Sequence, residues 1–325
     1  MSQASEQAAT LLGAGRAGEA VSVAEAATAR GDADATHLVA IWRLAGDPLP
    51  RDLAEARRLL RAATEAGHAD AAMIEVALTA NGTGAPPDWT LARARLEAAA
   101  KAHGGAAAED LALLSAMAID DAGRPIRLPE IEIVRDTPAI ARWRGLLTPA
   151  ECAHVAMAVR DILGPSMVAD PATGRLIAHP VRTSSAAQIG PTRESLPIAA
   201  ILMRLAAISG SDVACGEPLT VLHYAPGQQY RPHMDGLPGE ANQRVATVIV
   251  YLNEGYAGGE TVFPEAGVTL AGRGGDAVMW SNVRPDGTPD PATRHAGQPV
   301  RHGAKWAVTR WIRARPLDVW KLGQG

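Results

Sequence analysis

The first 120 residues place small apolar side chains among charged ones with the spacing of amphipathic helices. The segment Asp52–Ala63 begins with a candidate N-cap, and its helical pattern ends before the stop signal Ala66-Gly67. Several residues recur with a period of 36, which predicts helix–turn–helix units that stack to bury their apolar stripes. The recurring positions are Ala26-Ala27, Ala62-Ala63 and Ala98-Ala99, Gly31 and Gly67, Gly46 and Gly82, and Asp52 and Asp88.

The pattern changes after residue 120, where Gly123, Pro125 and Pro129 break the helical periodicity. Short alternating or apolar runs follow, separated by turn residues, and they predict antiparallel strands of a sandwich or jelly roll rather than βαβ units. The predicted strands are Ile131–Val134, Leu219–Tyr224, Arg244–Leu252, Glu260–Phe263, Val268–Leu270, Asp276–Trp280 and Lys305–Ile312.

Two helices are predicted inside this β-rich part. Thr148, Pro149 and Glu151 form a helix start, with a capping threonine, a proline at the first position and a glutamate at the third. A second helix is predicted over Leu196–Ile208.

We therefore expect an α+β protein of two domains. An N-terminal α-helical repeat solenoid precedes a double-stranded β-helix, or jelly roll, with flanking helices. The expected boundaries are 1–118 for the repeats, 119–137 for a linker and first strand, 138–316 for the jelly roll and 317–325 for a C-terminal tail.

Composition and charge narrow the function. The 325 residues carry a net charge of −4, with no dense Lys/Arg cluster, so we expect neither a nucleic-acid nor a membrane-surface role. No apolar run approaches ~18 residues and no leader is visible, so a cytoplasmic location is expected. Cys152 and Cys215 are too few for a disulfide framework or a Cys-based zinc site.

Three side chains form a candidate metal site. His233 and Asp235 are two residues apart, so on a strand or strand end they point to the same side. His295 follows 60 residues later. Two histidines and one carboxylate on one face of a metal leave three positions open, which is the arrangement suited to non-haem Fe(II) and oxygen chemistry.

Lys305 adds a second element of chemistry. It lies ten residues after His295 and begins an apolar strand. An ammonium pointing into a barrel has to find an anion, and a dicarboxylic cosubstrate would provide one.

Five sequence blocks together carry a family resemblance. They resemble the prolyl 4-hydroxylase branch of the Fe(II)/2-oxoglutarate dioxygenases, in the right order and spacing, over about residues 138–316. The upstream stretch Val181–Ser185 matches that branch too. The blocks are Val221–Asp235, Arg244–Asn253, Gly258–Pro264, His295–Val300 and Lys305-Trp306.

The resemblance implies a role for each matched residue. His233, Asp235 and His295 would hold Fe(II), and Lys305 would pair with the C5 carboxylate of 2-oxoglutarate. The rest of the cosubstrate pocket would be formed by Tyr224, Thr261 and Trp311. The peptide groove would be faced by Arg244, Tyr230, Arg182 and Ser184.

The implied activity is hydroxylation of a peptidyl side chain, with proline expected, using O2 and releasing succinate and CO2. Ascorbate is a candidate reductant. The same chemistry on a free amino acid or other small substrate, a zinc-dependent hydrolase and a non-catalytic metal-binding scaffold stay open.

Residues 10–118 resemble Sel-like, TPR-related repeats, which often bind peptides or proteins. Here they have two possible roles: recruiting a peptide or protein substrate, or only supporting the fold.

Overall fold

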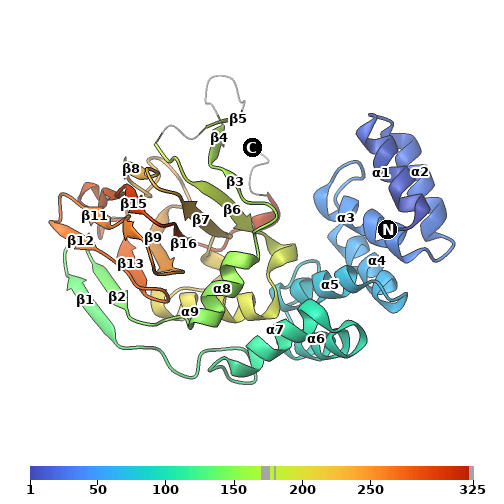
Figure 1. Cartoon of the computed structure of the whole chain (residues 1–325), viewed down its shortest axis with the longest axis horizontal. Coiled ribbons are helices and arrows are strands. Elements are labelled where there is room, and N and C mark those ends of the chain that lie inside the picture. The colour runs from blue at the N-terminus through green and yellow to red at the C-terminus, as the bar shows by residue number, and fades with distance from the viewer. Residues whose placement is uncertain (170–175, 179–180, 322–325) are drawn as a thin grey trace. The chain divides into compact units, whose positions relative to one another are not determined.

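The computed structural model describes residues 1–169, 176–178 and 181–321, so the end of the predicted C-terminal tail, residues 322–325, lies outside the described residues (Figure 1). The chain divides into two compact units. Unit 1 comprises Met1–Gly123 and Pro191–Ala200, and unit 2 comprises Arg124–Gly190 and Ile201–Gly325. Each is described by itself below.

Unit 1 is built from consecutive helices that pack against their neighbours along the chain. Helix pairs of this kind bury their apolar faces mainly against adjacent pairs. The helices are α1 (Gln3–Gly13), α2 (Ala17–Thr28), α3 (Ala33–Ala45), α4 (Leu53–Glu65), α5 (Ala69–Asn81), α6 (Trp89–His103) and α7 (Gly105–Ala116).

The helix ends follow the period of 36 residues. Asp52 and Asp88 cap α4 and α6, and each carboxylate accepts a hydrogen bond from the backbone N–H three residues later. Gly46 and Gly82 end α3 and α5 in the left-handed conformation, at φ 85° and 77°, which glycine adopts without strain. The predicted repeats are therefore confirmed as stacked helical pairs.

Unit 2 contains two larger antiparallel sheets and two short strand pairs. The eight-stranded sheet has the order β1-β2-β13-β9-β16-β7-β6-β3, and the four-stranded sheet has the order β12-β11-β14-β8. The short pairs are β10-β15 and β4-β5. The strands are β1 (Ile131–Arg135), β2 (Ile140–Trp143), β3 (Gly164–Pro165), β4 (Met167–Ala169), β5 (Leu176–Ala178), β6 (Ser185–Ile189), β7 (Leu219–Tyr224), β8 (Tyr230–His233), β9 (Arg244–Tyr251), β10 (Ala257–Gly258), β11 (Thr261–Phe263), β12 (Val268–Leu270), β13 (Ala277–Ser281), β14 (His295–Gly297), β15 (Val300–His302) and β16 (Lys305–Arg313).

The core of unit 2 joins side chains from both larger sheets. Tyr251 and Trp280 of the eight-stranded sheet pack with Phe263 and Leu270 of the four-stranded sheet, and all four are almost completely buried. Two sheets that pack in this way form the jelly roll that the strand spacing predicts. The expected α+β fold class is confirmed.

Two helices accompany these sheets. Thr148 and Glu151 form the predicted capping box at the start of α8 (Pro149–Met157). The second predicted helix is α9 (Leu196–Ser209), whose Arg204 forms a bidentate, buried ion pair with Glu151. Short 3-10 turns complete the fold at η1 (Pro191–Arg193), η2 (Val213–Cys215), η3 (Pro291–Thr293) and η4 (Val319–Lys321).

Among the described residues, none of the helices combines the length and the apolar character needed to cross a bilayer.

Candidate metal centre

The four-stranded sheet brings the three candidate metal ligands together. His233 ends β8 and His295 begins β14, and the two face each other as partners in the antiparallel ladder. Asp235 follows β8 by two residues. One possible ligand atom from each of the three side chains lies within 4.8 Å of the others. Strand pairing therefore closes the 62-residue separation in sequence between His233 and His295.

Backbone contacts fix the orientation of both imidazoles. Nδ1 of His233 lies 2.8 Å from the carbonyl oxygen of Arg231, and Nδ1 of His295 lies 3.0 Å from that of Thr293. Each Nε2 lies 3.7 Å from an oxygen of Asp235. A ring whose Nδ1–H bonds a carbonyl presents Nε2 as a lone pair, which is the form that binds a metal.

The Asp235 carboxylate is buried, and hydrogen bonds from other side chains orient it. Thr247 Oγ1 donates a hydrogen bond of 2.7 Å to its Oδ2, and the Asn282 side-chain amide donates one of 2.9 Å to Thr247 Oγ1. Burial opposes ionisation of Asp235, but the neighbouring histidines and the Thr247 hydroxyl keep its pKa below the ordinary value. Burial and the proximity of His295 lower the pKa of His233 to about 4. His233 is therefore a neutral imidazole and Asp235 an ionised carboxylate at neutral pH.

Lys305 lies on β16, opposite Tyr224 in the β7 ladder. It is 5% exposed, and its Nζ donates a hydrogen bond of 2.6 Å to the carbonyl oxygen of Gly259. Burial lowers its pKa to about 8, while the charge of Glu260 acts in the opposite direction. Within the part of the chain that the structure describes, no carboxylate lies within ion-pair distance of this ammonium. A buried cation of this kind fits an anionic ligand.

A narrow cavity of about 30 Å³ connects Lys305 with the metal-ligand cluster. Both larger sheets contribute to its wall. The site residues predicted from the sequence that line it are Arg182, Tyr224, Tyr230, His233, Asp235, Thr261, His295, Lys305 and Trp311.

The inner wall of this cavity is polar at two points. Thr261 Oγ1 and the Tyr251 hydroxyl lie 2.9 Å apart and share a hydrogen bond. The indole nitrogen of Trp311 is buried and has no hydrogen-bond partner among the described residues. These groups, together with the hydroxyl of Tyr224, could orient a polar ligand.

Tyr230 covers one face of the His233 ring. Its ring stacks on His233 with a centroid distance of 3.5 Å, and the guanidinium of Arg182 lies 5.3 Å from the centre of the same ring.

Two predicted substrate-binding residues do not line the cavity. Arg244 forms a bidentate ion pair with Glu217, at 2.6 and 2.8 Å, and its guanidinium stacks 4.2 Å from the ring centre of Trp311. Ser184 is 2% exposed, and its hydroxyl lies 3.0 Å from that of Ser166. The contact of Arg244 and Ser184 with substrate stays a prediction. In this structure both side chains contact other residues of the protein instead of lining the cavity.

The sequence reasoning missed three residues around the site. Thr247 and Asn282 hold Asp235, and Tyr251 bonds Thr261. Thr247 and Tyr251 lie on one predicted strand, and the alternation of side chains could have placed both on the same face of the sheet. No spacing in the sequence connects either of them to its partner elsewhere in the chain.

The donor set fits Fe(II). Two imidazole nitrogens and one carboxylate oxygen lie within 4.8 Å of one another, close enough to bind one ion. This combination suits a non-haem iron with open positions. The buried, carboxylate-free ammonium of Lys305 fits 2-oxoglutarate in the same way.

Comparisons with known proteins agree with this chemistry. Residues 219–313 match the 2OG-Fe(II) oxygenase superfamily. The chain is 32% identical over 242 residues to probable prolyl 4-hydroxylase 10 of Arabidopsis thaliana, covering 66% of this chain and 83% of that protein. The chain belongs to the prolyl 4-hydroxylase family of Fe(II)- and 2-oxoglutarate-dependent dioxygenases. Across the curated relatives it matches, the aligned part spans from 35% to 83% of the relative's own length.

Two solved structures are similar to different parts of this family member. A viral collagen prolyl hydroxylase from Paramecium bursaria Chlorella virus-1, in a 2OG complex, is 28% identical, with a TM-score of 0.45, covering 56% of this chain and 99% of that one. A Sel1 repeat protein from Oxalobacter formigenes is 23% identical, with a TM-score of 0.31, covering 34% of this chain and 85% of that one.

Proposed function

We propose that this chain hydroxylates a prolyl residue in a peptide, consuming 2-oxoglutarate and O2 and releasing succinate and CO2. The observation that carries the proposal is the pairing of two features in one cavity: the His-Asp-His cluster, and a buried lysine with no carboxylate partner among the described residues. A metal-binding scaffold or a zinc hydrolase gives no reason to bury such a lysine. The family relationship supports the same reaction class.

Different residues would act at the two ends of the cosubstrate. His233, Asp235 and His295 would hold Fe(II) on one face, and the bound metal with its cosubstrate would supply the oxidising power that C–H hydroxylation needs. Lys305 would bind the distal carboxylate at the buried end of the cavity. Thr261 would then stand beside the same carboxylate.

The protein walls would keep water away from the reacting centre. Asp235 and Lys305 are 4% and 5% exposed, so charges placed between them interact more strongly than they would in water. Tyr230 and Arg182 would border the opening through which the peptide presents its proline.

The test is succinate formation by the full chain with Fe(II), 2-oxoglutarate and a proline-rich peptide, together with mass spectrometry of the peptide. We expect succinate and one added oxygen on proline. His295→Ala should abolish both. His302→Ala, at an exposed position of β15, is the matched control and should retain both.

Two outcomes separate the alternatives. Oxygen added to free proline but not to peptide would replace the peptidyl substrate with a small one. Absence of succinate from iron-loaded, folded protein with both substrates would overturn the proposed reaction.

A further inference from the structure

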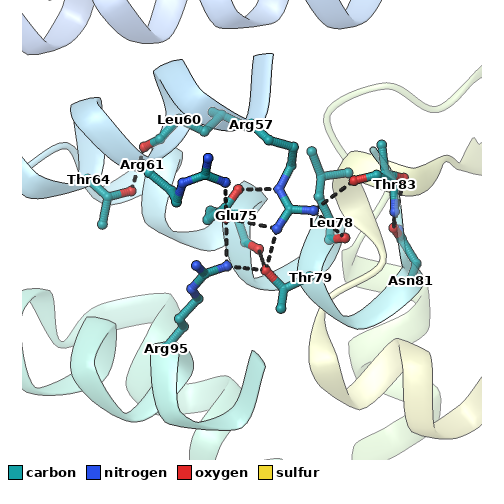
Figure 2. Close-up of polar contacts among 10 residues, drawn as sticks. All are labelled: Arg57, Leu60, Arg61, Thr64, Glu75, Leu78, Thr79, Asn81, Thr83 and Arg95. Atoms are coloured by element: carbon teal, nitrogen blue, oxygen red, sulfur yellow. Dashed lines mark hydrogen bonds and ion pairs between the residues drawn. The ribbon is translucent and has the colours of Figure 1, made fainter. Parts of the chain in front are cut away.

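A buried polar cluster lies inside the helical repeats of unit 1, whereas the metal centre belongs to unit 2. It is centred on Glu75 of α5, which is 2% exposed and is contacted by three arginines: Arg57 and Arg61 from α4, and Arg95 from α6 (Figure 2). A single carboxylate thus faces three guanidinium groups within unit 1.

Arg57 alone neutralises Glu75 and is fully satisfied. Its Nε and Nη2 donate to the two oxygens of Glu75 at 2.6 and 2.9 Å, in a bidentate pair. Its remaining hydrogens go to the Thr79 hydroxyl and to the carbonyl oxygens of Leu78 and Thr83. All five donors of this guanidinium are therefore used.

The charges of Arg61 and Arg95 are not needed to neutralise Glu75, because Arg57 already does so. Nη1 of Arg95 lies 2.6 Å, and Nη1 of Arg61 3.5 Å, from an oxygen that Arg57 already engages. Their side chains are 27% and 44% exposed, so both reach the surface of the unit. Within the described residues, the structure gives no other ion-pair partner to either of them.

The repeat period shows that the equivalent helices of the other repeats have no such cluster. Thirty-six residues before Glu75 the chain has Val39, and thirty-six residues after it the chain has Leu111. The equivalent helices therefore carry an apolar side chain where α5 carries a glutamate. Since a buried ion pair rarely stabilises a fold more than apolar packing does, the polar cluster calls for another explanation.

Arg61 and Arg95 line a cavity of about 330 Å³. The apolar part of the lining, the alanine wall, consists of Ala72, Ala98, Ala99 and Ala102. The other lining residues are Thr64, Glu75, His103 and the exposed Glu65.

The charges favour a monoanion. Arg57, which does not line the cavity, already neutralises Glu75, so Arg61 and Arg95 against Glu65 leave one positive charge, His103 not counted. A carboxylate would balance that charge and match the planar guanidinium groups. A phosphate dianion would exceed it and be repelled by Glu65.

We infer that this cavity, the Arg61/Arg95 pocket, binds the side-chain carboxylate of an acidic peptide segment. Glu75 and Thr79 hold Arg95 in place before the ligand arrives, and the alanine wall accommodates the aliphatic part of the ligand's side chain. The pocket would give the repeats a binding activity of their own. This inference goes beyond the proposed hydroxylation and does not depend on it.

The test is fluorescence anisotropy of the full chain with a labelled, end-blocked peptide of alternating glutamate and alanine. We expect it to bind at least about tenfold more tightly than its glutamine–alanine analogue, because the charge-assisted contacts are lost in the analogue. The glutamine–alanine peptide with a free C-terminus tests whether the pocket binds a terminal carboxylate instead. A phosphoserine–alanine peptide tests whether it binds a dianion. If either of these two peptides binds more tightly than the glutamate–alanine peptide, the assignment to a side-chain carboxylate is overturned.

Matched variants locate the binding. Arg61→Gln with Arg95→Gln should weaken the glutamate peptide at least about tenfold. Arg58→Gln and Arg93→Gln lie on the same two helices, pair with Glu55 and Glu97 outside the pocket, and should change affinity less than twofold. Equal binding to the double variant, or no preference for glutamate in the wild type, would overturn the inference.

Succinate formation without a peptide, measured on the same double variant, separates the two proposals. We expect it to equal that of the wild type, since neither arginine belongs to the oxygenase cavity. Lost peptide binding with retained turnover supports the pocket. Absent turnover in the wild type contradicts only the hydroxylase proposal.

Discussion

A single hydroxyl controls the geometry of the candidate metal centre. Among the described residues, no backbone group holds the Asp235 carboxylate as the carbonyls hold His233 and His295, and the Thr247 hydroxyl donates to its Oδ2. Because a carboxylate can rotate and bind in more than one way, such an outer contact sets which oxygen faces the metal.

Replacing this hydroxyl should therefore weaken iron binding. We expect Thr247→Val to lower Fe(II) affinity by about 10- to 100-fold, the usual range for the loss of an outer partner of a ligand. Titration with Fe(II) under nitrogen measures it. Thr220→Val is the matched control, since Thr220 is buried with its hydroxyl unbonded. Equal iron affinity in Thr247→Val and the wild type would show that the hydroxyl does not position Asp235.

Lys305 should determine the requirement for 2-oxoglutarate. Removing one partner of a buried charge pair costs roughly 2–5 kcal/mol, which corresponds to about 30- to several-thousand-fold in affinity. We expect Lys305→Ala to raise the 2-oxoglutarate requirement by this factor and to leave iron binding near normal. Lys305→Arg should retain part of the affinity, because a guanidinium still pairs with a carboxylate. An unchanged requirement in Lys305→Ala would place the cosubstrate elsewhere.

His37 in α3 should make unit 1 sensitive to acid. Burial and the charge of His68, whose ring centre lies 4.2 Å away, lower the pKa of His37 to about 4 from 6.5. The unfolded chain therefore binds the proton more readily, and stability that is complete above pH 6.5 is lost as the pH falls toward 4. His37 is partly exposed, so we expect a loss of about 1–2 kcal/mol.

The measurement for His37 is urea unfolding at pH 7.5, 6 and 4.5. His37→Asn removes the titrating group, so its stability should fall less over this range than that of the wild type. Parallel pH profiles in the two proteins would exclude His37 as the source.

At the scale of elements, the helical pairs depend on a few buried contacts between them. Arg57 ties α4 to α5 through Glu75 and also bonds the last turn of α5 and the loop after it. Alanine-rich faces supply little apolar area per helix, so one well-satisfied arginine has a large share in the docking of this pair.

Breaking this tie should destabilise unit 1 strongly. We expect Arg57→Met to lower the free energy of unfolding by about 3 kcal/mol, the low end for a broken buried pair, because Arg95 still contacts Glu75. Arg58→Met, whose exposed pair with Glu55 lies on the same helix, should cost less than about 1 kcal/mol. Adding Glu75→Leu to Arg57→Met should recover much of the loss. Failure to recover would show that Arg57 acts through its backbone contacts instead.

The elements also show what sequence patterns can and cannot predict. Capping residues such as Thr148 and Asp52 act within one turn of chain, so the helix starts could be predicted from them. The short strands β2 and β6 were missed, whereas β12, of only three residues, was predicted, because a run of this length is identified only where turn residues mark its ends. The convergence of Thr247 with Asp235 depends on tertiary pairing, which no local pattern contains.

At the scale of the whole chain, the two units do not correspond to two continuous stretches of sequence. Pro191–Ala200, which includes the beginning of α9, belongs with the helical repeats in unit 1. Within that unit the Asn81 side-chain amide donates hydrogen bonds to the Pro191 carbonyl and to the Glu194 carboxylate, each of 2.9 Å. The sequence places a single boundary near residue 118 because the return of the chain to the repeats leaves no periodic signal.

Removing the repeats should therefore affect more than recruitment. A chain that begins at Leu128 loses Asn81 and the rest of unit 1 before Pro191–Ala200. Leu196 and Ile198 belong to this segment and are fully buried in the intact chain, so we expect them to become more exposed. Exposed apolar surface of this kind favours aggregation. We expect the shortened chain to melt at least about 5 °C lower, since a loss of 1–2 kcal/mol shifts a domain of this size by several degrees. Scanning calorimetry and light scattering on both chains measure it, with Asn81→Ala in the full chain as the milder control. A shortened chain that stays monomeric and melts with the full one would show that α9 is stable without the repeats, and would leave peptide binding as their remaining role.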